Sequence, residues 1–184
     1  MKKWESMENK IFIAYSQLLS EIFYRKIKVT DIIEICGISR RTFYNYFSST
    51  NDLHLQIIIF MQDEINLILN DNTIFENGTS KKVLNYLFSN KDLFFNIINY
   101  YPDIDKISNA FIKSTFQNYS EESFYVNLNS SMVIPTDYLF DVYVSIIQTI
   151  VFRWIKNYCT ESSEEILLII NNATAHIKIG EALN

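Results

Sequence analysis

The segment KIKVTDIIEICGISRRTFYNYFSSTNDL, residues Lys26–Leu53, contains two short helical patterns separated by a glycine. The first pattern runs from Thr30 to Cys36, and Thr30 is placed to cap the free N–H groups of the opening turn. Gly37 can adopt the left-handed conformation that ends a helix, and Ser39 is a suitable cap for the helix that follows. Two helices joined by so short a turn predict a helix-turn-helix motif.

The second pattern, Arg40–Phe47, has two distinct faces. Phe43 and Phe47 are four residues apart and fall on one face, as core anchors should. The opposite face carries the polar and basic side chains of Arg40, Arg41, Tyr44 and Asn45. The second helix of a helix-turn-helix lies in the DNA major groove, where arginine can bond a guanine edge and asparagine an adenine edge. The residues alone leave two interpretations open, which are a DNA-reading helix and a solvated surface helix of an ordinary helix pair.

The run from Gly37 to Phe47, followed by Leu53, resembles the DNA-binding segment of TetR-family transcriptional regulators. The resemblance covers the predicted preceding helix, Asn9–Tyr24, both helices of the motif and the start of the next helix, which is roughly the first third of the chain. The remainder of the chain resembles the family only in being apolar and all-helical. The resemblance implies that the second helix of the motif is a DNA recognition helix.

The resemblance also implies roles for individual residues. The opening of the recognition helix approaches the bases, whereas Phe43 and Phe47 remain structural. The DNA-binding candidates are Lys28, Thr30, Ser39, Arg40, Arg41, Thr42, Tyr44, Asn45, Tyr46 and Thr50. Two positions depart from the family pattern, because Thr50 stands where a lysine is usual and Ile33 where a small alanine is usual. Without the lysine a phosphate contact is lost, unless the hydroxyl and backbone N–H of Thr50 replace it.

Only three glycines and two prolines occur among the 184 residues, and 48% of the residues are hydrophobic. So few helix breakers favour long helices over a sheet of short strands. We therefore expect an all-α fold, with an N-terminal three-helix helix-turn-helix DNA-binding domain and a C-terminal helical bundle for effector binding and dimerisation. The expected DNA-binding domain is residues 1–50, with the first turn of the connecting helix included to about 53, and the ligand-binding and dimerisation domain is 51–184.

Capping signals and periodicity predict the helices of the second domain. Ser49 with Asp52 opens a long helix that ends at about Leu69, and Asn90 caps a later helix. The run Ser162–Glu165 caps the last helix. The other expected helices are Lys81–Ser89, Lys91–Tyr100, Ile104–Tyr119 and Asp137–Tyr158, with breaks at residues 71–80 and 118–135.

The net charge of −5 is unevenly distributed along the chain. Residues 1–50 carry eight Lys or Arg against five Asp or Glu, whereas the remainder carries eight against sixteen. The basic end is the expected nucleic-acid end, although an acidic body kept for solubility also explains the asymmetry. The sequence shows neither a secretion signal nor an apolar run long enough to cross a bilayer, so we expect a cytoplasmic protein with no membrane partner.

No pattern in the sequence indicates an enzyme or a metal site. A Gly-rich phosphate loop, a His-Glu-x-x-His pair, a Cys-x-x-Cys pair and a nucleophile elbow are all absent. The sequence therefore predicts no catalytic residues, no cofactor and no metal. Cys36 and Cys159 are expected to be buried free thiols, and His54 a surface or hinge residue.

The final two predicted helices carry broad apolar faces. In the TetR family these helices commonly pair with the same two helices of a second subunit as a four-helix bundle, and the resemblance therefore implies a homodimer. The alternative is that both faces form intramolecular core. The candidate interface residues are Tyr143, Ile147, Ile150, Trp154, Ile166, Ile170 and Ala173.

The sequence thus predicts a transcriptional regulator that binds double-stranded palindromic operator DNA, with repression relieved by a small-molecule effector as the expected mode. The resemblance places the effector in an apolar pocket of the body, but no residue is identified as a contact. The alternative is a helical protein-interaction module, or a ligand-dependent co-activator that binds another regulator. Thr50 in place of the lysine is the feature that favours this alternative.

Overall fold

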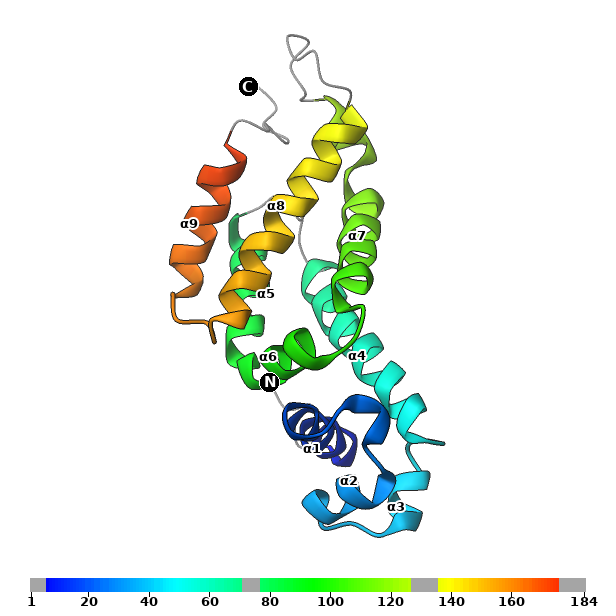
Figure 1. Cartoon of the computed structure of the whole chain (residues 1–184). Helices are drawn as coiled ribbons and strands as arrows, with labels where there is room; N and C mark the ends of the chain where they lie inside the picture. Colours follow the sequence, from blue (N-terminus) through cyan, green and yellow to red (C-terminus); the bar gives the residue numbers. More distant parts are fainter. Residues whose placement is uncertain (1–5, 71–76, 127–135, 176–184) are drawn as a thin grey trace. The chain divides into compact units, whose positions relative to one another are not determined.

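The computed structural model describes residues 6–70, 77–126 and 136–175, and every regular element in this part of the chain is helical (Figure 1). The all-α fold class is therefore confirmed. The elements, in chain order, are α1 (Met7–Glu21), the 3-10 turn η2 (Tyr24–Lys26), α2 (Val29–Cys36), α3 (Arg40–Tyr44), α4 (Thr50–Asn70), α5 (Asn77–Ser89), α6 (Lys91–Tyr100), α7 (Ile104–Val126), α8 (Thr136–Lys156) and α9 (Ser163–Thr174).

The chain forms two compact units, and the division does not follow the chain order. The first unit combines Met1–Glu64 with Asp92–Pro102, and the second combines Ile65–Lys91 with Asp103–Asn184. Helix α4 begins at the expected domain boundary but contributes to both units. Helix α6 is grouped with the first unit, although its place in the sequence had assigned it to the second domain.

Aromatic rings fill the core of the first unit. Phe12 of α1 lies 5.6 Å from Phe47 and 5.2 Å from Phe60 between ring centroids, and Phe43 lies 5.9 Å from Phe47. Because Phe60 is in the third turn of α4, the start of α4 is part of this core. Leu53 of α4 is fully buried in the same unit. A helix-turn-helix alone is too small to bury its apolar side chains, and α1 and α4 supply the missing surface.

The start of α2 differs from the expectation. The helix begins at Val29, with Lys28 at the N-cap position, and the Asp31 carboxylate accepts a hydrogen bond from the Lys28 backbone N–H at 2.8 Å. Thr30 lies within the first turn, so its predicted role as the cap is wrong. A carboxylate at the third helical position can reach back to the N–H before the helix, and this interaction sets the start here.

Other boundaries also shift. Helix α1 ends at Glu21, because Ile22 is extended with φ −129° and ψ 132°, and the expected helix to Tyr24 is too long. Helix α7 continues to Val126 through part of the expected break at 118–135, of which 127–135 lies outside the described residues. The Asn90 side chain contacts the preceding helix, where its Nδ2 donates to the Tyr86 carbonyl at 2.8 Å.

The second unit is a helical body built around α8. Helix α9 packs against α5 and α8, and α7 packs against α8 (Figure 1). Trp154 of α8 is 1% exposed, stacks on Phe88 with 6.2 Å between ring centroids, and donates its Nε1–H to the Glu161 carbonyl at 2.9 Å. The predicted cap of the last helix is confirmed, because Ser162 and Glu165 form a capping box. These contacts fix the corner between α8 and α9.

Helix α8 contains an apolar stretch, Tyr138–Lys156, that is long enough to cross a membrane and has a mean hydropathy of 1.3. This stretch corrects the expectation that no apolar run reaches that length. A single such helix is weak evidence for a membrane span, because the core helix of a soluble protein has the same length and composition.

Candidate nucleic-acid interface

Gly37 forms the turn between α2 and α3. Its φ of 65° and ψ of 34° are left-handed, and its N–H donates to the Glu34 carbonyl at 3.4 Å. The Ile38 N–H donates to the Ile33 carbonyl at 3.2 Å, which satisfies a second free carbonyl at the helix end. The structure therefore contains the short glycine turn that the sequence predicts, and α3 starts three residues after Gly37.

Ser39 caps the N-terminus of α3. Its Oγ accepts a hydrogen bond from the Thr42 N–H at 3.0 Å and is hydrogen-bonded to the Thr42 hydroxyl at 2.8 Å. The regular helix ends at Tyr44, earlier than the expected Phe47, although the Phe47 N–H still donates to the Phe43 carbonyl at 3.0 Å. The first turn of α3 is therefore held in place before any ligand binds.

The two faces of α3 separate as expected. Phe43 and Phe47 are 0% and 1% exposed and belong to the core of the first unit. Arg40 and Arg41 are exposed, and neither guanidinium group forms a hydrogen bond or an ion pair with another described residue. The other exposed candidates are Lys28, Thr30, Ser39, Tyr44, Asn45 and Tyr46, while Thr42 and Thr50 are half-buried. Two free guanidinium groups thus project from the start of the helix.

The N-terminus of α4 carries a negative charge next to Thr50. The Asp52 carboxylate accepts hydrogen bonds from the Ser48 backbone N–H at 2.7 Å and from the Ser48 hydroxyl at 2.9 Å, and these bonds lower the pKa of Asp52. The Ser49 Oγ accepts from the Asp52 N–H at 3.0 Å, as the predicted cap requires. A charged carboxylate already occupies this helix terminus, and it would repel a phosphate that approached Thr50.

His54 is the residue for which the prediction fails most clearly. The sequence placed it at the surface or a hinge, but its side chain is 7% exposed. Its ring stacks between Tyr24 and Tyr101, and its Nδ1 is hydrogen-bonded to the Tyr15 hydroxyl. No local pattern could have shown this, because the three tyrosines come from distant parts of the chain. Among the described residues, no group of three or more His, Cys, Asp or Glu could hold a metal ion.

The candidate dimer residues divide into core and surface. Trp154 and Ile166 are 1% and 3% exposed, so they pack inside the second unit and cannot meet a second chain. Ala173 is exposed, and the remaining candidates, Tyr143, Ile147, Ile150 and Ile170, are half-buried. Burial raises the pKa of Tyr143 to about 12, so its hydroxyl stays protonated.

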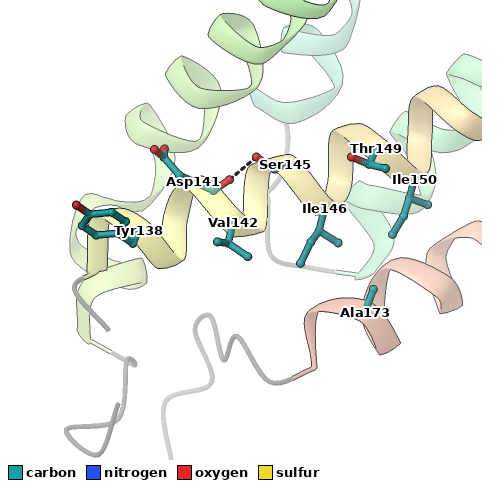
Figure 2. A pocket seen from close by; sticks show the side chains of 8 residues that line it. All are labelled: Tyr138, Asp141, Val142, Ser145, Ile146, Thr149, Ile150 and Ala173. Atoms are coloured by element: carbon teal, nitrogen blue, oxygen red, sulfur yellow. Dashed lines mark hydrogen bonds between the residues drawn. The ribbon is translucent and has the colours of Figure 1, made fainter. Parts of the chain in front are cut away.

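A shallow groove of about 530 Å³ lies on the α8–α9 side of the second unit (Figure 2). Figure 2 shows Val142, Ile146 and Ile150 pointing from α8 to the side on which Ala173 of α9 lies. The residues that line the groove are Tyr138, Asp141, Val142, Ser145, Ile146, Thr149, Ile150 and Ala173. Only Ile150 and Ala173 were named as interface candidates from the sequence, and the other six lining residues were not.

Both cysteines are free thiols, as predicted. Cys159 is buried, and this burial raises its pKa to about 11. Cys36 is only half-buried, because it lies at the end of α2, where its Sγ contacts the Lys10 carbonyl at 3.6 Å.

A helix-turn-helix unit with a free basic recognition helix, joined to a helical body, defines a class of transcriptional regulators. The family model for a transcriptional regulator C-terminal region of the TetR type matches residues 77–176, which is more than half of the 184 residues. The chain therefore belongs to the TetR family of transcriptional regulators. Members of this family are generally non-enzymatic.

Solved structures share the fold over nearly the whole chain. The dihydroxyacetone kinase operon activator DhaS has a TM-score of 0.60 at 24% identity, covering 96% of this chain and 98% of DhaS. A TetR transcriptional regulator from Streptococcus agalactiae 2603V has a TM-score of 0.60 at 19% identity, and the match covers 91% of this chain and 92% of that protein. The fatty acid degradation regulator FadR from Bacillus halodurans has a TM-score of 0.59 at 14% identity, and the match covers 93% of this chain and 95% of FadR. Comparison with curated proteins found no match.

Proposed function

We propose that this regulator is a homodimer in the cytoplasm that binds a palindromic operator through one α3 from each chain. The observation that carries the proposal is the pair of unpartnered, exposed guanidinium groups of Arg40 and Arg41 at the start of α3, beside the exposed Tyr44. Each guanidinium can bond a guanine edge in bidentate fashion or a phosphate as a charge. Because Phe43 and Phe47 anchor the opposite face, the reading face has a fixed orientation.

Two recognition helices are needed for useful affinity. One α3 reads only a few base pairs, whereas two helices about 34 Å apart read successive major grooves of an inverted repeat. The surface proposed to join two chains is the groove face of α8 and α9. Val142 lines the groove and is 49% exposed, and Ile169, four residues before Ala173 on α9, is 44% exposed. Apolar side chains this exposed are suited to an interface. The body then changes the affinity for DNA when a small molecule binds it.

The proposed sign of control is repression, relieved by the effector. One observation favours a second candidate, which is activation. The similar solved structure DhaS is described as an operon activator, and it matches 96% of this chain. An activator that works with another regulator would tolerate the weak phosphate contact at Thr50. Transcription in vitro from a promoter carrying the bound site separates the two, because a repressor lowers the yield of transcript and an activator raises it.

The binding proposal is tested by selecting duplexes from random DNA with purified protein at near-physiological salt. We expect an inverted repeat to be enriched by the wild type and lost with Arg41→Ala, which removes roughly 1–3 kcal/mol of base discrimination per contact. Tyr44→Ala should also weaken binding. Lys82→Ala removes an exposed charge from α5 and is the matched control, which should enrich the same repeat as the wild type.

Two results would count against the proposal. Equal enrichment by wild type and Arg41→Ala would exclude the assigned reading face. No enrichment by a folded, dimeric wild type, with or without cell extract as a source of effector, would favour the interaction-module alternative.

A further inference from the structure

Three aromatic rings stack face to face inside the first unit. His54 lies at the centre, 3.9 Å from Tyr101 with an interplanar angle of 16°, and 5.3 Å from Tyr24 with an angle of 19°. Tyr15 meets the His54 ring edge-on and is hydrogen-bonded to its Nδ1. The stack Tyr24–His54–Tyr101 therefore joins η2, α4 and the end of α6, while α1 holds the central ring in orientation.

Tyr24 is placed to affect the helix-turn-helix directly. It opens η2, and the Ile27 N–H donates to the Tyr24 carbonyl at 3.3 Å just before α2 begins at Val29. The Ile27 side chain is 4% exposed, so η2 is anchored on one side by Ile27 and on the other by the stack. Loss of the stack would leave this entry turn with a single anchor.

Tyr101 lies next to the boundary between the two units along the chain. The chain leaves the first unit between Pro102 and Asp103, one residue after Tyr101, and α7 begins at Ile104. Two residues in this connection have a restricted backbone, because proline fixes its own φ and Asp103 has a φ of 57°. Asp103 also accepts a backbone hydrogen bond from Lys106 at 3.0 Å and forms an ion pair with its side chain at 3.1 Å. Tyr101 is therefore separated from the start of α7 by only two residues, both with a locally constrained backbone.

We propose that Tyr101 is a positioning residue for DNA binding, which holds η2 and α2 in place through the stack with His54 and Tyr24. This inference rests on the proposed function, since it names the contact by which a change in the body reaches the recognition helix. When Tyr101 withdraws, the entry to α2 loosens and operator affinity falls. When it is stacked, the motif is held ready for DNA.

The test compares two neighbouring tyrosines, Tyr100 at the last position of α6 and Tyr101 directly after it. Tyr101→Ala and Tyr101→Leu remove the stacked ring, Tyr101→Phe keeps it, and Tyr100→Ala removes a 43% exposed ring that is not in the stack. Hydrogen exchange of DNA-free protein measures the protection of residues 24–36, and a titration with the selected duplex measures affinity. For Tyr101→Ala and Tyr101→Leu we expect exchange about tenfold faster over 24–36 and affinity about tenfold weaker, which corresponds to one lost aromatic contact.

The controls separate positioning from general destabilisation. Exchange in α8 should stay at the wild-type rate in every variant, and Tyr101→Phe and Tyr100→Ala should lie within about twofold of wild type in both measurements. Tyr24→Ala combined with Tyr101→Ala should weaken DNA binding no more than either change alone, since both break the same stack. An additive loss would contradict the proposal.

Three further outcomes would overturn it. The first is an unchanged exchange rate over residues 24–36 in Tyr101→Leu. The second is faster exchange in Tyr101→Leu without a loss of DNA affinity. The third is a Tyr100→Ala variant that changes exchange and affinity as much as Tyr101→Ala does. If the wild type binds no duplex, this result contradicts the proposed function but not the role of Tyr101 in holding the turn. The exchange measurement then still decides whether Tyr101 holds the turn.

Discussion

At the scale of single residues, the imidazole of His54 is the group whose chemistry the fold changes most. It is 7% exposed and faces Tyr15, Tyr24 and Tyr101, with no charged partner among its ring and hydrogen-bond contacts. Burial lowers its pKa from 6.5 to about 4, so the side chain is neutral at physiological pH. The same burial raises the pKa of Tyr15, which keeps its hydroxyl protonated.

This shift predicts a pH dependence of stability. The folded protein disfavours the protonated imidazole, so between about pH 6.5 and pH 4 the unfolded chain binds more protons at this position. His54 therefore contributes its full stabilisation above about pH 6.5, and the contribution is lost as pH falls towards 4. The full loss is about 3 kcal/mol, and urea unfolding at a series of pH values measures it.

The control for this prediction is His54→Gln, which has no titrating group at the position. Its free energy of unfolding should fall less than that of the wild type between pH 6.5 and pH 4. The difference between the two falls should be up to about 3 kcal/mol. Parallel curves for the two proteins would show that His54 does not titrate with a lowered pKa. The carboxylates titrate in both proteins and cancel in the comparison.

At the scale of elements, the helix-turn-helix depends on interactions within a few residues. Asp31 sets the start of α2, Gly37 ends it, and Ser39 opens α3. The conformation at Gly37 is the most demanding of these features, because a φ of 65° strains any residue with a Cβ. An added Cβ there would meet no atom within 4 Å, so the cost of a substitution is backbone strain alone.

We therefore predict opposite effects for the same change at two glycines. Gly37→Ala should lower the free energy of unfolding by about 1 kcal/mol, since alanine resists the left-handed region. Gly78→Ala, in the first turn of α5, also meets no atom within 4 Å and has no positive φ. It should raise stability by up to about 1 kcal/mol, because alanine is the better helix former.

Thermal or urea unfolding of the two variants beside the wild type tests the pair. A Gly37→Ala protein as stable as the wild type would show that the turn can adopt another conformation. The DNA affinity of Gly78→Ala should not change, whereas a shifted turn in Gly37→Ala should also weaken binding.

At the scale of the whole molecule, the proposed dimer decides whether two recognition helices act together. Val142→Glu places a charge in the groove, and Ile169→Glu places one on α9 four residues before the groove residue Ala173; both side chains are about half exposed. The monomer should stay folded, but the dimer should dissociate roughly 100-fold more readily, because a charge buried in an apolar interface is costly. Sedimentation velocity measures the change, and operator affinity should fall with it.

The matched control is Leu67→Glu, on α4. Leu67 is 54% exposed, similar to Val142 at 49%, but it lies on α4 and not on α8 or α9. This variant should remain dimeric. A dimer that survives Val142→Glu and Ile169→Glu would place the interface elsewhere on the chain.

The sequence by itself determined the all-helical class, the family, the glycine turn at Gly37 and the two faces of α3. These features follow from contacts within a few residues, namely caps, a left-handed glycine and side chains four residues apart. The free Arg40 and Arg41 and the buried Phe43 could therefore be predicted from the sequence, together with the cap at Ser162.

Only the tertiary structure decided which apolar positions are core and which are surface. Trp154 and Ile166 share the periodicity of their exposed neighbours, and packing against α5 and the α8–α9 corner is what buries them. Helix α6 groups with the first unit, and His54 is enclosed by tyrosines from α1, from η2 and from the position after α6. These features depend on residues tens of positions apart, and the periodicity of a single helix carries no information about which neighbour will cover it.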